Sequence, residues 1–404
     1  MTISLPRRDA GAVAGAPRFG LAQVTWRQQR ATLLTLGGLA AALAAFMLAA
    51  GLRGHTLYPA YLRDDCDPTM APGLIARAAA PSCRQLGSQF PWLGYPFDAR
   101  ETVLVLGGNF LNSYPNEVTL AMLALFLLTG MFLGAPLLAR ELGQGTFRFA
   151  WTQGTSPVRW CVTKLVLLGG AAMVAGAGLG ALGAWSLQPF NLIAETGSRW
   201  QGGQFETTVV TAAAWAGFAF ALGAFSGTLF RRTVPAMAAT LAAMGALLVA
   251  TFSTFNALLL SVHPLTAPDN AQAAQTGLAT AAKPVRLLDL AMNTGVSRLN
   301  AGPPGSLLLR GWYTGPDGHR LSGAPAATLI RAFDKLNGTR WPAWLSAHHD
   351  TFVVSYQPGG RYWLLQGVAG GVLFLLALVL GAATVGLVVR SRGARIRGRR
   401  PGPG

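Results

Sequence analysis

The chain has 404 residues, of which 51% are apolar and only 12% are charged. This is too little charge to cover a water-soluble protein of this length, so the composition excludes that class and indicates an exterior that largely faces lipid. The net charge of +17 comes from 29 Arg and 3 Lys against 15 acidic residues. Because no basic stretch alternates with stacking aromatic residues, the charge does not indicate nucleic-acid binding.

Six uncharged apolar runs are long enough to cross the ~30 Å hydrocarbon core of a bilayer. They predict transmembrane helices over residues 31–52, 118–139, 165–185, 207–230, 234–258 and 363–389. Residues 1–30 hold no apolar region followed by a small-residue cleavage site, so we expect no cleaved signal peptide. The predicted fold is an all-α membrane protein with about six spans.

The distribution of basic residues predicts the orientation, because Lys and Arg are retained on the cytoplasmic side. With the N-terminus inside, the cytoplasmic segments 1–30, 140–164, 231–233 and 390–404 hold 17 basic and only two acidic residues. The segments 53–117, 186–206 and 259–362 hold 15 basic and 13 acidic residues. We therefore expect cytoplasmic N- and C-termini and two large extracytoplasmic loops in a multi-pass protein of the plasma membrane.

The arm that precedes the first span has an amphipathic pattern. Phe19, Ala22 and Trp26 fall on one helical face, and Arg18, Arg27 and Arg30 are available to anionic head groups. This pattern predicts a helix lying along the inner leaflet. A poorly ordered basic arm is the alternative.

The extracytoplasmic segments hold two of the three cysteines. Cys66 and Cys83 share the loop 53–117, where a disulfide between them would close a loop of about 18 residues and contribute ~3 kcal/mol. Cys161 is expected to be a free thiol at the inner face. The second large loop, 259–362, mixes Pro/Gly turns with a helical pattern over 326–336 and is expected to form a small folded insert.

Catalytic and metal-binding motifs were sought along the chain. A phosphate-binding loop needs a glycine directly before its lysine, and Lys164, Lys283 and Lys335 all lack one. His348 and His349 are adjacent and would point in different directions, so a surface turn is favoured over a metal site. We expect no enzymatic activity, no bound metal and no cofactor in this chain.

The predicted spans carry no ionisable residue near their middle, which argues against a proton- or sodium-driven antiporter. An uncharged pathway fits an apolar or amphiphilic cargo. Small residues recur at close-packing spacing, as in Gly176 with Gly180 and Gly223 with Gly227. General packing within the bundle is favoured over a specific dimer motif.

The predicted cytoplasmic segment 140–164 is the most informative part of the sequence. Arg140 and Glu141 stand where a span leaves the membrane, followed by glycines that can end the helix. A short helix starting near Thr146 would expose Arg148 and Trp151, a geometry that fits docking to a soluble partner. The alternative is an ordinary interfacial loop held by an Arg–Glu pair.

Three stretches resemble one known family. Residues 139–165 resemble the Arg-Glu-Leu-x-x-Gly-Thr…Arg-x-Ala-Trp-Thr-Gln…Arg-Trp…Lys-Leu signature of permease subunits of actinobacterial-type ABC exporters, in the type-2 ABC permease family. Thr-Trp-Arg-Gln at 25–28 and Tyr-Gln-Pro…Arg-Tyr-Trp at 356–363 agree with it. The resemblance therefore extends over the whole chain.

This resemblance implies a half-transporter that forms a homodimer, or a heterodimer with a sister permease, on two cytoplasmic ABC ATPase subunits that bind ATP and Mg. The segment around Glu141 would couple the ATPase to the helices. The residues carried over to this ATPase-coupling role are Arg140, Glu141, Gly145, Thr146, Arg148, Trp151, Thr152 and Gln153. Many members have a second Glu at the position of Gly143, so contact between Glu141 and a basic patch on the ATPase could be rearranged here.

The function expected from these observations is that of the transmembrane subunit of an ATP-driven exporter for a hydrophobic or amphiphilic substrate. A non-transporting scaffold or sensor that uses the external insert is the main alternative. A membrane enzyme is a third, but Asp64, Asp65 and Asp67 lack a partner base or metal ligands.

Overall fold

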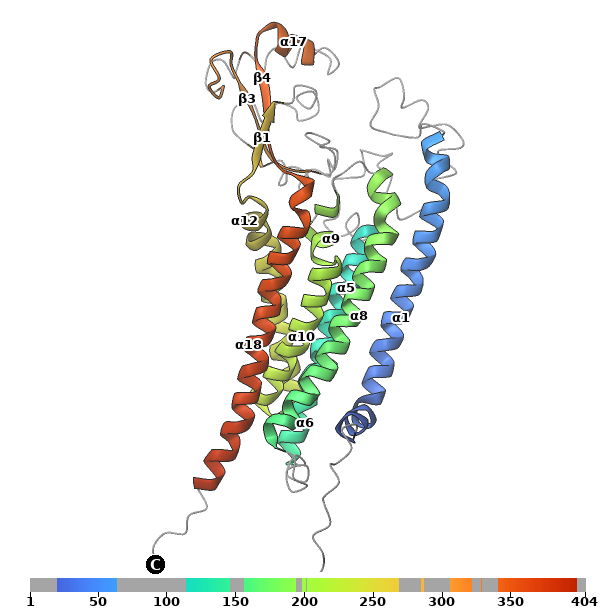
Figure 1. Cartoon of the computed structure of the whole chain (residues 1–404), viewed down its shortest axis with the longest axis vertical. Coiled ribbons are helices and arrows are strands. Elements are labelled where there is room, and N and C mark those ends of the chain that lie inside the picture. Colours follow the sequence, from blue (N-terminus) through green and yellow to red (C-terminus); the bar gives the residue numbers. More distant parts are fainter. Residues whose placement is uncertain are drawn as a thin grey trace, which may run out of the picture.

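The computed structural model describes residues 20–63, 114–145, 156–193, 198–200, 202–268, 285–286, 306–321, 328 and 341–397. These residues form an elongated helical bundle with a small β-sheet at one end (Figure 1). The first helix begins and the last helix ends at the opposite end of the bundle. We refer to these two ends as the sheet end and the terminal end.

Six helical segments in the described part of the chain are long and apolar enough to cross a membrane, as the sequence predicts. Four spans are single helices: α1 (Gly20–Arg63), α8 (Pro157–Ile193), α10 (Val209–Phe230) and α18 (Tyr362–Arg397). The second span consists of α5 (Tyr114–Leu128), the π-helix η1 (Thr129–Gly134) and α6 (Ala135–Gln144). The fifth consists of α11 (Thr233–Ala250), the π-helix η3 (Thr251–Phe255) and α12 (Asn256–Leu260). Several extend beyond the predicted runs, so Lys164 lies within a helix and not in a loop.

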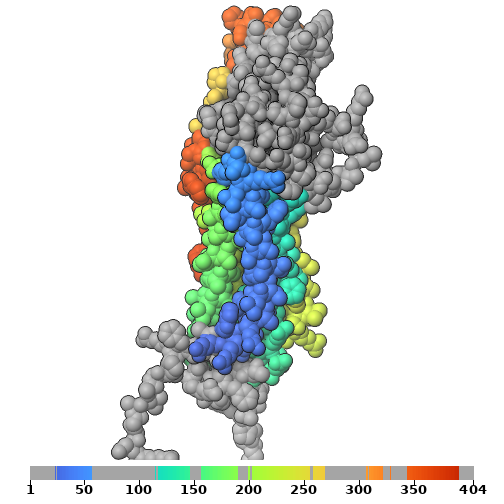
Figure 2. All heavy atoms as spheres, turned by 90° about the vertical axis from the view of Figure 1, so that its right-hand side faces the viewer, coloured from blue at the N-terminus to red at the C-terminus, as the bar shows by residue number. Residues whose placement is uncertain are grey.

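The α10 helix is the centre of the bundle. It packs against α8, α18, η1, α6 and α11, and most of its residues are buried. Its sequence is rich in Ala and Gly, which lets the surrounding helices approach closely. By contrast α1 packs mainly along α8 and lies on the outside of the bundle (Figure 2).

Both glycine pairs singled out in the sequence serve packing within the chain. A methyl group on Gly176 would lie 2.7 Å from the carbonyl oxygen of Ala212, and one on Gly180 would lie 2.9 Å from the amide of Val209. Gly223 and Gly227 face the backbone of the second span, and a methyl group on either would overlap a carbonyl oxygen there. Close approach of helix backbones therefore explains both pairs.

The second span contains a π-helical turn directly before Pro136. Proline has no N–H to donate and its ring would clash with the carbonyl four residues earlier. The chain widens here, and the amide of Ala135 donates to the carbonyl oxygen of Gly130, five residues back. Such π-bulges are frequent at functional sites, and this one turns Phe132 outward, where it is 43% exposed.

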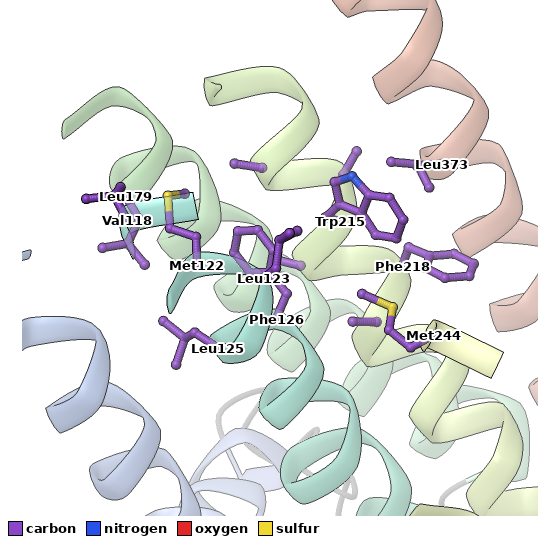
Figure 3. Close-up of a cluster of buried hydrophobic side chains, with 14 of the residues drawn as sticks. Val118, Met122, Leu123, Leu125, Phe126, Leu179, Trp215, Phe218, Met244 and Leu373 are labelled. Carbon is purple, nitrogen blue, oxygen red and sulfur yellow. The ribbon is translucent and has the colours of Figure 1, made fainter. Parts of the chain in front are cut away.

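One hydrophobic core joins α1, α5, α8, α10, α11 and α18 (Figure 3). Trp215 and Phe218 of α10 lie edge to face at 6.1 Å, beside Met122 and Phe126 of α5 and Met244 of α11. A second cluster closes the terminal end around Leu137, Leu138, Trp160, Cys161, Phe220 and Val388. Close packing of this kind holds the other five spans to the central helix.

The segment between α12 and α18 corrects the prediction of an all-α chain. It holds a four-stranded antiparallel sheet in the order β1-β4-β3-β2, with β1 (Leu265–Pro268), β2 (Val285–Arg286), β3 (Leu307–Thr314) and β4 (Thr351–Gln357), and a short helix α17 (Trp341–Ala347). Phe352 and Val354 of β4 are buried, as the β-branched and aromatic residues of this stretch favour. The 3₁₀ turn η5 (Gly359–Arg361) leads from β4 directly into α18.

Several sequence predictions lie outside the described residues. These are the Cys66–Cys83 disulfide, nearly all of the helical pattern over 326–336, and the aspartates at 64, 65 and 67. Cys161 is a buried free thiol, as expected. The start of α1 bends away from the axis of the rest of that helix (Figure 1), and the placement of this arm at the inner leaflet stays a prediction.

Candidate functional site at the terminal end

At the terminal end, α6 ends just before the residues 146–155 and α8 begins just after them, and these two helix ends lie close together. Gly145 closes α6 in the left-handed conformation, with φ of 73°, which glycine adopts without strain. At the other side, the hydroxyl of Ser156 accepts a hydrogen bond of 3.2 Å from the amide of Arg159 and caps α8. Pro157 at the first helical position favours the same start.

A buried ion pair joins these two helices. The Lys164 ammonium lies 2.5 Å from Oε1 of Glu141, and the two side chains are 4% and 13% exposed. Because both groups are largely shielded from water, their attraction is screened less than that of an exposed pair. The pair therefore fixes the end of α6 against the first two turns of α8.

The same lysine also contacts α1. Its ammonium donates a 3.2 Å hydrogen bond to Oε1 of Gln28, and it lies 4.8 Å from the centre of the Trp160 ring. The Lys164 ammonium of α8 thus contacts a carboxylate of α6, an amide of α1 and an aromatic ring of its own helix, so one cation joins three helices. We name Gln28, Glu141, Trp160 and Lys164 the lysine junction.

Apolar side chains seal the lysine junction from the bundle side. Leu137 and Leu138 of α6 are fully buried, and Trp160 and Cys161 pack in the same cluster. An ion pair in such surroundings is costly to separate, because each partner would be left as an uncompensated buried charge. The lysine junction is therefore a stiff connection between α1, α6 and α8.

The structure describes three of the eight residues carried over from the resemblance. Arg140 is exposed, Glu141 is in the ion pair, and Gly145 ends α6. Thr146, Arg148, Trp151, Thr152 and Gln153 lie outside the described residues, as does the short helix expected from Thr146. Glu141 pairs with Lys164, whereas the residues 146–155 of the alternative interpretation, a loop held by an Arg–Glu pair, lie outside the described residues, so that interpretation stays a prediction.

Lys164 and Gln28 were not singled out by sequence reasoning as functional side chains. A signal existed, because Lys164 is the only lysine and Glu141 one of only two acids in the predicted cytoplasmic segments. A sole lysine and a nearby acid at the edge of apolar spans are candidates for a buried pair. Hydropathy alone does not reveal that contact.

A second polar cluster lies at the sheet end. Glu206, of the short helix α9 (Gly202–Glu206), is 1% exposed, and its Oε2 accepts a 2.6 Å hydrogen bond from the Trp215 indole. Nearby, the Tyr362 and Thr208 hydroxyls are 2.8 Å apart, and Thr211 donates a 3.1 Å bond to Gln366. The predicted loop 186–206 is thus partly folded into the bundle. Glu206 binds α10, and the carbonyl oxygen of Phe205 accepts a hydrogen bond from Gln366 of α18, so this segment joins the starts of both helices.

Replacing Tyr362 with phenylalanine should lower the thermal stability of the purified protein. The change deletes a buried hydroxyl that Thr208 and Gln366 contact, which costs about 1–2 kcal/mol when the partners remain buried. The matched control is Trp363→Phe, next to it and 61% exposed, which should change the midpoint little. Equal midpoints for the two variants would contradict a structural role for this hydroxyl.

The His348–His349–Asp350 sequence is placed at the end of α17. His348 stacks on Trp344 with ring centres 3.9 Å apart, and burial raises the pKa of the Asp350 carboxyl while the charge of His348 lowers it. His349 adopts a positive φ of 56°, as in a turn. The arrangement is that of a helix end and not of converging ligands.

Comparison with known proteins identifies one family. The model of a family described as ABC-2 membrane transporter related matches residues 37–255. Neither the curated proteins nor the solved structures contain a match to the chain. The matched stretch includes Glu141 and Lys164 but ends before the sheet and α18.

Proposed function

Because the chain belongs to the ABC-2 membrane transporter related family, whose model covers more than half of its length, we propose that it is the membrane-spanning subunit of an ATP-driven exporter. Membership of this family implies association with an ABC ATPase subunit. In the proposal, that subunit binds and hydrolyses ATP with Mg, and the chain moves a hydrophobic or amphiphilic substrate out across the plasma membrane as a homodimer or with a sister permease.

The observation that carries this proposal is the lysine junction. A permease without its own ATPase must transmit a movement from its cytoplasmic surface to its helices. The residues 146–155 are flanked by α6 and α8, and the ion pair between Glu141 and Lys164 joins these helices close to that segment, within about three turns on either side. A displacement of the segment would therefore move α6, α8 and, through Gln28, α1 together.

The uncharged spans support the proposed substrate class. A pathway through or beside α10 would meet Ala, Gly and aromatic side chains, which favour apolar over ionic cargo. Alternating access, or lateral extraction from the inner leaflet, fits such a cargo, with the two end states selected by the nucleotide state of the partner ATPase.

The proposal is tested by purifying the tagged chain in mild detergent from its native membrane and identifying the proteins that remain bound. We expect a small ABC ATPase to co-purify and to hydrolyse ATP. Glu141→Gln should retain the ATPase but lose transport in vesicles, because the junction can no longer hold α6 to α8. The matched control is Gln144→Ala, an exposed residue at the end of the same helix that is not among the residues carried over to the coupling role.

A chain that purifies without any ATPase, and whose membrane vesicles show no ATP-dependent transport, would contradict the exporter proposal. That outcome would favour the scaffold or sensor that uses the external insert. A complex that hydrolyses ATP equally well with and without Glu141, and transports equally well, would keep the exporter but remove the junction from its mechanism.

A further inference from the structure

The short turn between α10 and α11 lies against the end of α6. A methyl group on Gly143 of α6 would lie 2.8 Å from the carbonyl oxygen of Arg231, closer than such carbons approach backbone in proteins. The α10 helix also contacts the backbone of the second span at Gly227 and Gly223, one and two turns before Arg231. The turn and the end of α6 therefore form one continuous surface, at the point where the residues 146–155 begin.

Arg231 closes α10 in a conformation that favours glycine. Its φ is 52°, and its amide donates a 3.1 Å hydrogen bond to the carbonyl oxygen of Gly227. A left-handed residue that ends a helix is usually glycine, because a Cβ atom is strained there. Here the chain carries an exposed guanidinium despite that strain. Backbone strain of this kind points to a use for the side chain outside the fold.

The surface around this turn is positively charged. Arg232 is exposed beside Arg231, and Arg140 is exposed on α6, one turn before the end of that helix. Glu141 is the only acid that the structure describes at the terminal end, and Lys164 neutralises it. We name Arg140, Arg231 and Arg232 the arginine patch.

The predicted cytoplasmic segments as a whole have the same charge. Of their 17 basic and two acidic residues, Lys164 and Glu141 neutralise each other, which leaves 16 basic residues and one acid, Asp9. Glu141 is 13% exposed and already paired, so its charge is not available to a basic partner. A protein that docks at this end must present acidic side chains, because a basic surface would be repelled.

We propose that the arginine patch is a docking site for an acidic surface of the cytoplasmic ATPase subunit. This inference rests on the proposed function. It adds the chemistry of the partner's surface, and it adds the turn between α10 and α11 as a second contact beside the residues 146–155. Because this turn touches α6 and ends the central helix, a displacement of the turn would reach both α6 and α10.

The test uses the full-length chain, expressed alone, in nanodiscs of phosphatidylcholine, whose head group has no net charge. The probe is the ATPase that co-purifies with the chain from its native membrane, and its dissociation constant is measured at rising salt concentration. Arg231→Gly with Arg232→Gln should weaken binding on the order of tenfold, about threefold for each arginine. The double variant should also bind with less dependence on salt, because salt screens the attraction between exposed charges.

The glycine substitution separates docking from folding. Glycine adopts the φ of 52° without strain, so Arg231→Gly should leave the thermal midpoint of the chain unchanged or raise it while ATPase binding falls. A side chain that served only the fold would not give this combination. The matched control is Arg53→Gln with Arg310→Gln, exposed arginines of α1 and β3 toward the sheet end, which should leave binding unchanged.

A cross-link tests the chemistry of the partner's surface. Carbodiimide joins an amine to a carboxylate, and Lys164, the only lysine in the predicted cytoplasmic segments, is buried. The unmodified chain should therefore give no cross-link through these segments' lysine. Arg231→Lys with Arg232→Lys should keep most of the affinity and become joined to Asp or Glu residues of the ATPase, which mass spectrometry locates.

An ATPase that binds the unmodified chain and the double variant equally would overturn this inference and leave the exporter proposal intact. A double variant that keeps its affinity for the ATPase but loses binding of added phosphatidylglycerol would assign the arginines to lipid and overturn it as well. An unmodified chain that binds no ATPase would contradict the proposed function itself, and this inference with it.

Discussion

Replacing Lys164 with methionine should destabilise the protein by about 3 kcal/mol and abolish coupled transport. Methionine keeps the length and apolar stem of lysine, so packing against Trp160 is largely retained. Glu141, however, becomes a carboxylate that is 13% exposed and has lost its cation. Removing one partner of a buried pair is costly because the remaining charge has neither water nor a counter-ion. Thermal unfolding in detergent and vesicle transport measure the two effects.

The double variant Glu141→Gln with Lys164→Met separates stability from mechanism. Neutral side chains of similar volume often replace a buried ion pair with little loss of stability. We therefore expect the double variant to regain most of the lost midpoint, while transport stays impaired because the stiff connection between α6 and α8 is still absent. A double variant that transports as well as the unmodified chain would show that the ion pair serves stability alone.

The membrane-spanning part of the fold follows from the sequence because one physical constraint dominates it. A segment in hydrocarbon must be apolar over about 20 residues and must satisfy its backbone internally, so hydropathy predicts each span. The close-packed glycines also follow, since Gly176 and Gly223 lie at the spacing that brings helix backbones together. The helix ends do not follow, because α8 begins at Pro157, eight residues before the predicted span.

The sheet between α12 and α18 was missed for the opposite reason. Its strands lie far apart in the sequence, and β4 pairs with β1 across nearly 90 residues, so no local pattern specifies the partners. The strand signal of β4, in which the buried Phe352 and Val354 alternate with half-buried positions, is short and lies next to α18. Beside a long apolar span, an alternation this short gives only a weak strand signal.

The sequence predicts the local features of the candidate site but not the contacts between its helices. The turn after Glu141 and the helix-ending role of Gly145 follow from local chemistry. The pairing of Glu141 with Lys164 depends on how α6 and α8 come together, and Gln28 joins from a span more than 100 residues away. Such contacts depend on tertiary packing, which hydropathy and spacing do not encode.

Substituting Gly223 by alanine should be the most damaging small change in the bundle. The added methyl group would overlap the carbonyl oxygen of Gly130 and lie 2.8 Å from the amide of Ala135, both of them backbone atoms of the second span. Backbone cannot rotate aside as a flexible side chain can, so α10 would have to move away from η1 and α6. Overpacking of this kind costs about 1–3 kcal/mol and more where backbones touch.

The matched control for this variant is Gly245→Ala in α11, where an added methyl group meets no atom within 4 Å. Alanine is favoured over glycine in a helix by roughly 0.5–1 kcal/mol, so this control should be neutral or slightly stabilising. A lowered midpoint in the first variant and an unchanged one in the second would establish that the contact between α10 and the π-helical turn limits stability. Equal midpoints would mean that the second span can shift away from α10 at little cost, and that the bundle is looser at its centre than its close backbone contacts indicate.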